Sequence, residues 1–401
     1  MPLHSMTTTQ TKRKMKVGIV GAGAAGLCAA YTLQKDLKGL EDDDNNIADS
    51  VEIQILEASE RMGGRLRKLE GFVDYPIDIG GEWIHGNPKK LFTKIIDDPK
   101  VQINNIETIR YNVNPCYSWE EGKFYKYKEN WKQDHFMINY TWAQFVEEYF
   151  GKHVDSLIEY NTPIECIDYT NKDRIVLRSC HGDTYEADYV ILTASVTVLK
   201  RGDITFVPAL PSRTAKALSR MKMHPGFKIL FEFSEQFYHD GFSLEADDKV
   251  DGQRVNGENG ERFFYNESWK KRSNRHVLSV FNYGLTMKQF KGMTDDEMVQ
   301  KILQELDEMY DGKASATYLQ HFVQNWTTEP YIGGLYSEWQ SGTIKPMLEP
   351  VDDRIFFAGE AFPPDGENNG YAHGAAISGQ YQSRRILSRI QKETQKRAGS
   401  S

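Results

Sequence analysis

Apolar and polar positions near the N-terminus predict a strand, a tight turn and a helix. Residues 16–20 (KVGIV) form a short apolar run rich in β-branched residues, and residues 27–37 (LCAAYTLQKDL) carry a helical pattern. An acidic loop at 41–50 then leads into residues 51–58 (VEIQILEA), which alternate like a second strand. The three elements together predict a βαβ unit.

Further apolar runs predict strands far from this unit. Two of them lie at 188–196 (DYVILTASV) and 354–359 (RIFFAG), and between them lie candidate strands at 228–233 and 276–284 and an amphipathic helix at 295–310. We therefore expect an α/β fold, α+β overall, with a discontinuous Rossmann-like domain and a second domain of mixed sheet and helix. The expected boundaries are a flexible tail at 1–15, the Rossmann-like domain at 16–88, 155–205 and 342–395, and a substrate-binding domain at 89–154 and 206–341.

Composition limits the possible settings of the protein. No stretch of the 401 residues approaches the roughly 18 consecutive apolar residues of a membrane span, and the first sixteen residues lack the apolar core of a secretory signal. The four cysteines are scattered, without metal-ligand or disulfide spacing, which is typical of a reducing compartment. The net charge of −8 argues against nonspecific nucleic-acid binding. We expect a soluble, cytoplasmic protein without a metal, a membrane partner or a nucleic-acid partner; its oligomeric state is left open.

The turn GAGAAG at 21–26 has the spacing of a dinucleotide-binding fingerprint in its required setting. Gly21 permits the tight turn, Gly23 lets the backbone approach a pyrophosphate, and Gly26 allows close helix packing, while Ala24 and Ala25 open the helix toward the anion. The acid at the end of the second strand, Glu57, is placed to accept hydrogen bonds from ribose hydroxyls.

The residues after Glu57 favour a dinucleotide whose second phosphate is buried in the protein. Ala58 opens the sequence ASERMGGRLRK, in which Gly64 and Arg65 follow the second strand closely. Backbone N–H groups and a guanidinium can hold a phosphate there. An ordinary turn followed by surface arginines is the alternative.

Eight blocks in this order resemble the flavin-containing amine oxidases, the family of monoamine oxidases, polyamine oxidases and lysine-specific histone demethylases. The blocks are GAGAAG with Glu57, MGGR (62–65), DIGGEWIHG (78–86), NTPIECI (161–167), VILTASVTVL (190–199), GFKILFEF (226–233), NWTTEPYIGGLYSEW (325–339), and RIFFAGEAF with NNGYAHGAAISG (354–379). The resemblance implies FAD as the cofactor and makes the Rossmann-like domain an FAD-binding domain.

The resemblance also implies roles for single residues. Gly81, Trp83 and Ile84 would line the flavin, Ile164 would bond the adenine edge through its backbone, and Trp326 would pack on the ring system. Glu360 would hold the ribityl side, and Tyr371 with Ala372 would lie beside the pyrimidine end. Taken singly, each of these aromatic residues could equally be plain core. The matched blocks add further cofactor-binding candidates: Glu82, Ala194, Gly359 and Gly370.

The catalytic candidates implied by the resemblance are Lys228, Tyr336, Tyr371 and His85. Lys228 would reach a water near flavin N5, with a pKa depressed by burial; exposure on a half-buried strand is the alternative. Tyr336 and Tyr371 would form two aromatic walls that guide an amine, and His85 would face the substrate channel. The role of Glu82 stays open between binding a cationic amine and bonding backbone.

Leu335 matches the position at which monoamine oxidases carry the cysteine that bonds to flavin, so the FAD is expected to be non-covalent. The segment between WIHG and NTPIECI is shorter than in most family members, so walls of the substrate cavity are missing.

The resemblance implies an amine oxidase that transfers hydride from the amine α-carbon to flavin N5. The imine would then hydrolyse, and O2 would reoxidise the flavin and give H2O2. Polyamines are the preferred substrate class because of WIHG, the acidic balance and the non-covalent flavin. Two alternatives remain: an FAD oxidase or desaturase that acts on a non-amine, and a flavin-binding isoform with little catalysis.

Overall fold

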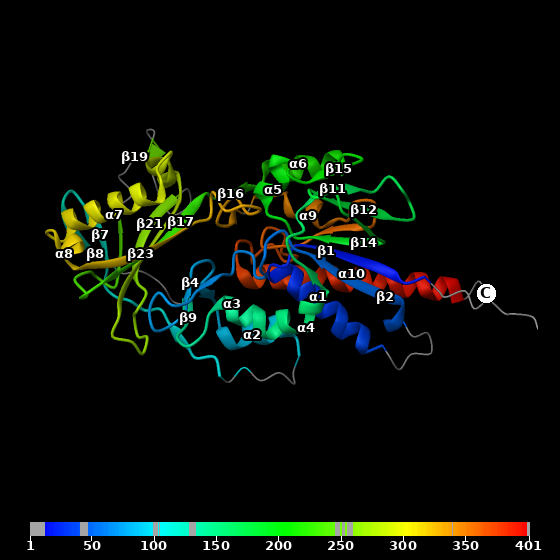
Figure 1. The fold of residues 1–401 in the computed structure, drawn as a ribbon, viewed down its shortest axis with the longest axis horizontal. Coiled ribbons are helices and arrows are strands. Elements are labelled where there is room, and N and C mark those ends of the chain that lie inside the picture. Colours follow the sequence, from blue (N-terminus) through cyan, green and yellow to red (C-terminus); the bar gives the residue numbers. More distant parts are fainter. Residues whose placement is uncertain are drawn as a thin grey trace, which may run out of the picture.

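Two sheets organise the computed structural model, which describes residues 13–40, 47–98, 103, 105–127, 134–244, 249–250, 253–254, 260–338 and 340–398. In Figure 1 a parallel sheet occupies the right half of the molecule and a larger mixed sheet the left half. Most of the expected tail at 1–15 lies outside the described residues.

The parallel sheet has five strands in the order β10-β2-β1-β14-β25. Their bounds are Met15–Val20 (β1), Val51–Leu56 (β2), Ile158–Glu159 (β10), Tyr189–Leu192 (β14) and Ile355–Phe357 (β25). Helices α1 (Ala24–Lys38) and α10 (Ala372–Ala398) pack against each other below this sheet in Figure 1. A second sheet, of order β13-β12-β11-β15, lies above it, with bounds Thr184–Ala187, Ile175–Ser179, Ile164–Asp168 and Thr205–Val207.

Alternating side chains give the parallel sheet two buried faces. Val17 and Ile19 of β1 belong to the core shared with α1 and α10, whereas Val190 and Leu192 of β14 belong to the core shared with the four-stranded sheet. A parallel strand covered on both sides reads as a continuous apolar run, which is why the sequence predicts these strands clearly.

The mixed sheet has seven strands in the order β23-β17-β22-β21-β18-β7-β8. Their bounds are Tyr318–Asn325 (β23), Gly226–Phe233 (β17), His276–Gly284 (β22), Gly260–Asn266 (β21), Gly241–Leu244 (β18), Cys116–Glu120 (β7) and Lys123–Tyr127 (β8). Helix α7 (Asp295–Met309), which begins at a capping box of Thr294 and Glu297, shares a core with Phe227, Ile229 and Phe231 of β17. The opposite face of β17, which carries Lys228, Leu230 and Glu232, is buried as well.

The other elements are short. The helices are α2 (Pro88–Ile96), α3 (Trp142–Val146), a π-helical turn (Glu147–Gly151), α4 (Lys152–Val154), α5 (Val196–Arg201), α6 (Ser212–Arg220), α8 (Lys313–Thr317), α9 (Ile344–Leu348) and 3-10 turns at Ala48–Ser50, Asp155–Leu157 and Leu285–Phe290. The strands are β3 (Lys68–Leu69), β4 (Ile77–Asp78), β5 (Ile84–His85), β6 (Thr108–Arg110), β9 (Asp134–Met137), β16 (Lys222–Met223), β19 (Lys249–Val250), β20 (Gln253–Arg254) and β24 (Ser337–Glu338).

The α/β fold class is confirmed, but the packing of two segments differs from the expected domains. Phe92 of α2 and Phe145 of α3 belong to the core of α1 and α10, and Leu218 of α6 belongs to the core of the four-stranded sheet. All three residues lie in ranges assigned from the sequence to the substrate-binding domain. The domain boundaries therefore stay a prediction. In the described part of the chain, no helix has both the length and the apolarity to cross a bilayer.

Candidate functional site

The glycine turn between β1 and α1 brings a helix N-terminus to the edge of the parallel sheet. Gly21 has φ +103°, and a Cβ at Gly26 would lie 1.9 Å from the carbonyl oxygen of Gly21, so neither position tolerates a side chain. A Cβ at Gly23 would meet nothing within 4 Å. The backbone at Gly23 is therefore open to a ligand, and the free N–H groups of the first turn of α1 lie next to it.

A cavity of about 560 Å³ extends from this turn, within the size range of cofactor sites. Most of the cofactor-binding residues suggested by the sequence lie in its wall: Gly21, Gly23, Ala24, Ala25, Glu57, Ala58, Gly64, Arg65, Gly81, Ile164, Ala194, Gly359, Glu360, Gly370, Tyr371 and Ala372. Segments that are far apart in the sequence thus form one elongated site.

Glu57 is held rigidly at the end of β2. One carboxylate oxygen accepts a hydrogen bond from the N–H of Ala22 at 2.6 Å, and the other accepts from the N–H and hydroxyl of Ser59 at 2.9 and 2.7 Å. These bonds fix the carboxylate at the cavity wall, and each oxygen still has acceptor capacity for a ligand hydroxyl.

Arg65 and Glu360 form an ion pair in the same wall. The Nη1 of Arg65 lies 2.9 Å from the Oε1 of Glu360 and 2.8 Å from the carbonyl oxygen of Leu335. The other oxygen of Glu360 accepts from the hydroxyl of Ser337 at 2.6 Å. The guanidinium is thereby positioned by protein groups, with other N–H donors left for a ligand phosphate.

Three residues expected at the flavin lie outside the cavity wall because they pack elsewhere. Trp83 makes edge contacts with Tyr111 and Tyr265 at 4.5 and 5.4 Å between ring centroids. Ile84 is fully buried in the core beside α1, and Trp326 is buried with its Nε1 donating to the carbonyl of Ile79 at 2.9 Å. Their expected contacts with flavin stay predictions.

Lys228 lies in a buried cluster of ionisable groups, which we call the ion cluster: Lys228, Glu82, Glu267 and Tyr265. The Nζ of Lys228 lies 2.9 Å from Glu82, 3.2 Å from Glu267 and 2.5 Å from the carbonyl oxygen of Asp78. The Tyr265 hydroxyl donates to Glu82 at 2.5 Å. Exposure of Lys228 is thus excluded, since only 2% of the residue is accessible.

The electrostatics of the ion cluster contradict the expected depression of the Lys228 pKa. Burial alone would lower the pKa of Lys228, but Glu267 and Glu82 outweigh it and raise the pKa above its usual value. Burial, followed by the charge of Glu267, raises the pKa of Glu82 from 4.5 to about 7. The pKa of Glu267 is lowered, because the attraction of Lys228 and Lys271 exceeds the cost of burial. Lys228 is therefore a permanent cation between two carboxyl groups.

The two roles left open for Glu82 from the sequence stay predictions. In the structure its carboxylate accepts hydrogen bonds from Lys228 and Tyr265, and the residue is not part of the wall of this cavity. Gly81, the residue before it, does line the cavity. The ion cluster is consequently joined to the cavity wall at Gly81 through the backbone of Glu82.

Tyr371 and His85 meet at the rim of the cavity. Their rings stack at 4.4 Å, and the Nδ1 of His85 lies 2.9 Å from the carboxylate of Asp134 on β9. His373 also stacks on Tyr371, at 5.1 Å, and its pKa falls to about 4, chiefly through burial. The imidazole of His85 is therefore oriented by a carboxylate and holds the ring of Tyr371.

Tyr336 contacts other aromatic residues than Tyr371 does. Its ring lies 5.1 Å from that of His224 and 5.6 Å from that of Tyr283, and burial raises its pKa above the usual range. Its side chain also approaches Gly370, since a Cβ there would lie 3.4 Å from it. Tyr336 thus lies next to Gly370, the residue before Tyr371, while the two tyrosine rings pack on different partners.

The fold and the site define a dinucleotide-binding protein. A family model described as "Flavin containing amine oxidoreductase" matches residues 24–147 and 134–387, so the chain belongs to this family. The sequence is 26% identical to polyamine oxidase 1 of Zea mays over 61% of this chain and 48% of that protein. It is 25% identical to lysine-specific histone demethylase 1B of Mus musculus over 61% of this chain and 29% of that protein. The chain thus matches about half of the first relative's length and less of the second's.

A solved structure of a triple mutant of putrescine oxidase shares the fold. It superposes with a TM-score of 0.72 at 16% identity and covers 94% of this chain and 99% of that chain.

The described residues fit FAD, the cofactor of the family. The open backbone at Gly23 suits a pyrophosphate, Glu57 suits a ribose, and the same cavity wall includes Ile164 and Tyr371. Leu335 lines the cavity. Cys180 also lies in the cavity wall, and its backbone N–H donates to the carbonyl oxygen of Pro163, the residue before Ile164.

Sequence reasoning missed three polar residues of the site: Glu267, Tyr265 and Asp134. Glu267 directly follows strand β21, and its carboxylate reaches the Nζ of Lys228 on β17. No local sequence pattern signals this contact, because it depends on the pairing of β17, β22 and β21.

Proposed function

We propose that this chain is an FAD-dependent amine oxidase that acts on small-molecule amines with O2 as electron acceptor. Family membership supports the class of reaction. The observation that carries the proposal is the single cavity that joins the glycine turn at 21–26 to Tyr371 and Leu335. A dinucleotide anchored at the turn would have its far end beside these residues, where an amine could meet it.

Bound FAD would supply the redox chemistry, namely acceptance of a hydride from the amine α-carbon at N5 and delivery of the electrons to O2 as H2O2. The residues of the chain would bind this cofactor and orient it. Glu57 would hold a ribose, the first turn of α1 the pyrophosphate, and Arg65 a phosphate oxygen. The imine product would hydrolyse in water. Leu335 lines the cavity and matches the position at which monoamine oxidases carry the cysteine that bonds to flavin. We therefore propose that the FAD is bound non-covalently.

We propose Lys228, Tyr336, Tyr371 and His85 as the residues nearest the reaction. Lys228 would act as a fixed positive charge, since its two carboxylate partners keep it protonated. The pair of His85 and Asp134 would hold Tyr371 at the cavity rim. A ring stacked in this way has little freedom to move, which favours a defined path for the amine.

Polyamines are the substrate class that we propose. The name of the Zea mays relative, the acidic net charge of −8, and the carboxylate of Asp134 beside His85 support a cationic substrate. No disulfide joins any of the four cysteines, all of which lie among the described residues, and this supports the cytoplasm as the compartment. We also propose that the parallel sheet belongs to the FAD-binding domain and the seven-stranded sheet to the substrate-binding domain.

Peroxide release tests the proposed function. The FAD-loaded protein would be mixed in air with spermine, spermidine, N-acetylated polyamines and simple monoamines in turn, and H2O2 would be followed with a coupled peroxidase. We expect release with at least one polyamine and none from the apoprotein. FAD-loaded protein that releases peroxide with none of the amines would contradict the proposal and favour a non-amine substrate or a flavin-binding isoform.

A further inference from the structure

The ion cluster stands out because it places more negative than positive groups inside the protein. Glu82 and Glu267 share the single ammonium group of Lys228, and all three side chains are almost completely buried, at 10%, 1% and 2% exposure. Burial of charge is costly unless each group is paired and hydrogen-bonded. A cluster of this kind therefore lowers the stability of the folded protein, which points to a role other than stabilising the fold.

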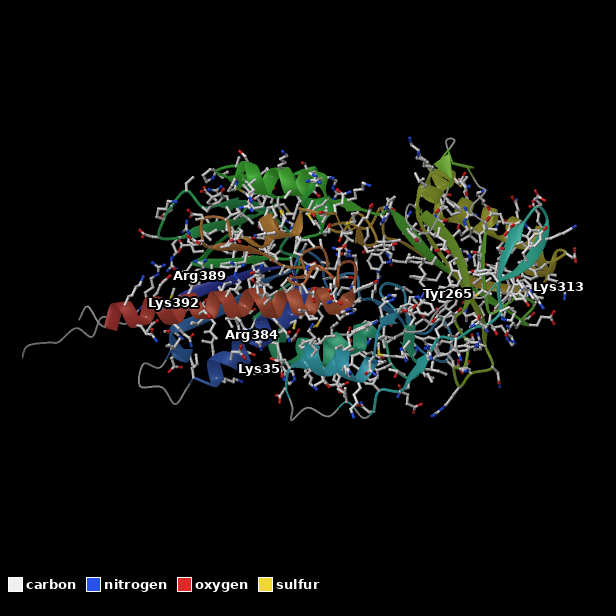
Figure 2. The ribbon with its side chains drawn as sticks, turned by 180° about the vertical axis from the view of Figure 1, so that it is seen from behind. Lys35, Tyr265, Lys313, Arg384, Arg389 and Lys392 are labelled. Carbon is white, nitrogen blue, oxygen red and sulfur yellow. The ribbon has the colours of Figure 1, made fainter. Side chains whose placement is uncertain are left out.

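Each of the three charged members of the cluster makes a further hydrogen bond. Tyr265 donates to Glu82 at 2.5 Å, Ser279 donates to Glu267 at 2.6 Å, and the carbonyl of Asp78 accepts from Lys228. Figure 2 shows Tyr265 on the lobe that carries the seven-stranded sheet. The charges thus have fixed positions and need no rearrangement to act on a neighbouring site.

The cluster is coupled to the cofactor cavity through the chain itself. Gly81 lines the cavity, Glu82 follows it directly, and the N–H of Gly81 bonds the carbonyl of Arg65, which also lines the cavity. A fixed charge close behind the wall of a redox site changes the relative stability of the oxidised and reduced cofactor, since reduction adds negative charge.

We propose that Glu82 and Glu267 are positioning residues that hold Lys228 as a cation behind the Gly81 wall, and that this cluster sets the reduction potential of the bound flavin. Lys228 stabilises the reduced flavin, and the two carboxylates oppose it. Uptake of one proton by a carboxyl group of the cluster would change its net charge from −1 to 0. The inference rests on the FAD site and not on amine turnover.

Further ionisable groups surround the cluster. Asp78 and Lys271 act on it through their charges, and Tyr75 is close to Glu267 and Glu82. Burial raises the pKa of Asp78 well above its usual value, which favours its neutral form. Lys228, Glu82 and Glu267 are the charged groups joined by direct contacts.

The midpoint potential of the bound FAD tests this inference. It is measured by anaerobic reduction with dithionite or with xanthine and xanthine oxidase against a reference dye, so no amine is needed. We expect Lys228→Met to lower the potential, and Glu82→Gln and Glu267→Gln to raise it. Opposite signs are the decisive result, because a general loosening of the site would shift all three in one direction.

Glu232→Gln is the matched control. Glu232 is a buried carboxylate on the same face of β17, and it pairs with Arg275 and Gln320 instead of Lys228. Its substitution should leave the potential unchanged. If it shifts the potential as much as Glu267→Gln, the effect is not specific to the cluster and the proposal fails.

The pH dependence of the potential in the unaltered protein provides a second readout if a variant loses FAD. We expect a change of slope near neutral pH, where the cluster takes up its proton, and the loss of this change in Glu82→Gln. Unchanged potentials in the variants, or a wild-type slope without such a change, would overturn the proposal. Failure of amine turnover alone would leave these potentials measurable and would count against the proposed function only.

Discussion

Removal of the positive charge from the ion cluster should destabilise the folded protein strongly. Lys228→Met replaces the ammonium with an apolar group of similar length and leaves Glu82 and Glu267 buried without the cation that they share. Loss of one partner from a buried ion pair costs about 3–5 kcal/mol, because the remaining charges cannot be solvated. That is a large share of the roughly 5–15 kcal/mol by which folded domains are stable. We expect a loss of this size near pH 8, where the carboxyl groups are most ionised.

The loss should become smaller as the pH falls. Without Lys228 both carboxyl groups have raised pKa values, so the folded variant takes up protons that the unfolded chain does not bind. A raised folded pKa gives stability that is present at low pH and is lost as the pH rises through that pKa. Lowering the pH from about 8 to about 6 should therefore recover part of the 3–5 kcal/mol, because protonation removes the uncompensated charge.

Urea unfolding followed by tryptophan fluorescence measures this effect. Lys222→Met is the matched control, since Lys222 is exposed and pairs with Glu338 at 3.4 Å on the surface; such pairs contribute about 0–1 kcal/mol. The triple variant Lys228→Met/Glu82→Gln/Glu267→Gln should regain much of the stability. A loss below about 1 kcal/mol for Lys228→Met, or a triple variant as unstable as the single one, would refute the reasoning.

Three further predictions concern the cofactor site and the acid in the cluster. Glu57→Ala should weaken FAD binding by about 1–3 kcal/mol, or roughly 5–150-fold, in a fluorescence titration of the apoprotein, whereas the exposed Glu60→Ala should not; equal affinities would contradict the role of Glu57. The pKa of Glu82 is about 7 in the folded protein against 4.5 for the ordinary group, so wild-type stability should fall as the pH rises between these two values. A Glu82→Gln variant whose stability depends on pH as strongly as that of the wild type would exclude Glu82 as the cause. Gly26→Ala should abolish flavin retention, because the new Cβ would lie 1.9 Å from the Gly21 carbonyl oxygen, and a normal flavin absorbance per chain would disprove this.

The elements with a strong hydrophobic period could be predicted from the sequence. β22 has the expected bounds of 276–284, and α7 ends one residue before the expected 310. Both carry a regular pattern over at least nine residues, and α7 also has its capping box. The glycine turn could be predicted for a different reason: its conformation requires glycine at fixed spacing.

The ion cluster could not be predicted, because its members come from segments that are far apart in the sequence. Lys228 and Glu267 are 39 positions apart and meet only through the pairing of β17, β22 and β21. The alternation in β17 correctly separates Lys228 from Phe227, but alternation does not tell whether the second face meets water or protein. Here Ile77 and Ile79 pack over that face beside Leu230, so the lysine is buried.

The core that a short helix joins could not be predicted from the linear pattern of apolar residues either. α2 and α3 lie in the segment between WIHG and NTPIECI, which the sequence predicts to be part of the substrate-binding domain. Phe92 and Phe145 stack at 4.8 Å within the core of α1 and α10. Amphipathic periodicity identifies the buried face of a helix, but it does not identify the partner.

An anaerobic visible spectrum tests the central claim most directly. The purified, FAD-loaded protein would be recorded before and after addition of spermine, spermidine, N-acetylated polyamines and simple monoamines in turn. We predict that at least one polyamine bleaches the flavin band and that air restores it with release of H2O2. A flavin spectrum that no amine changes would contradict an amine oxidase, and a protein that binds no FAD would contradict the whole account.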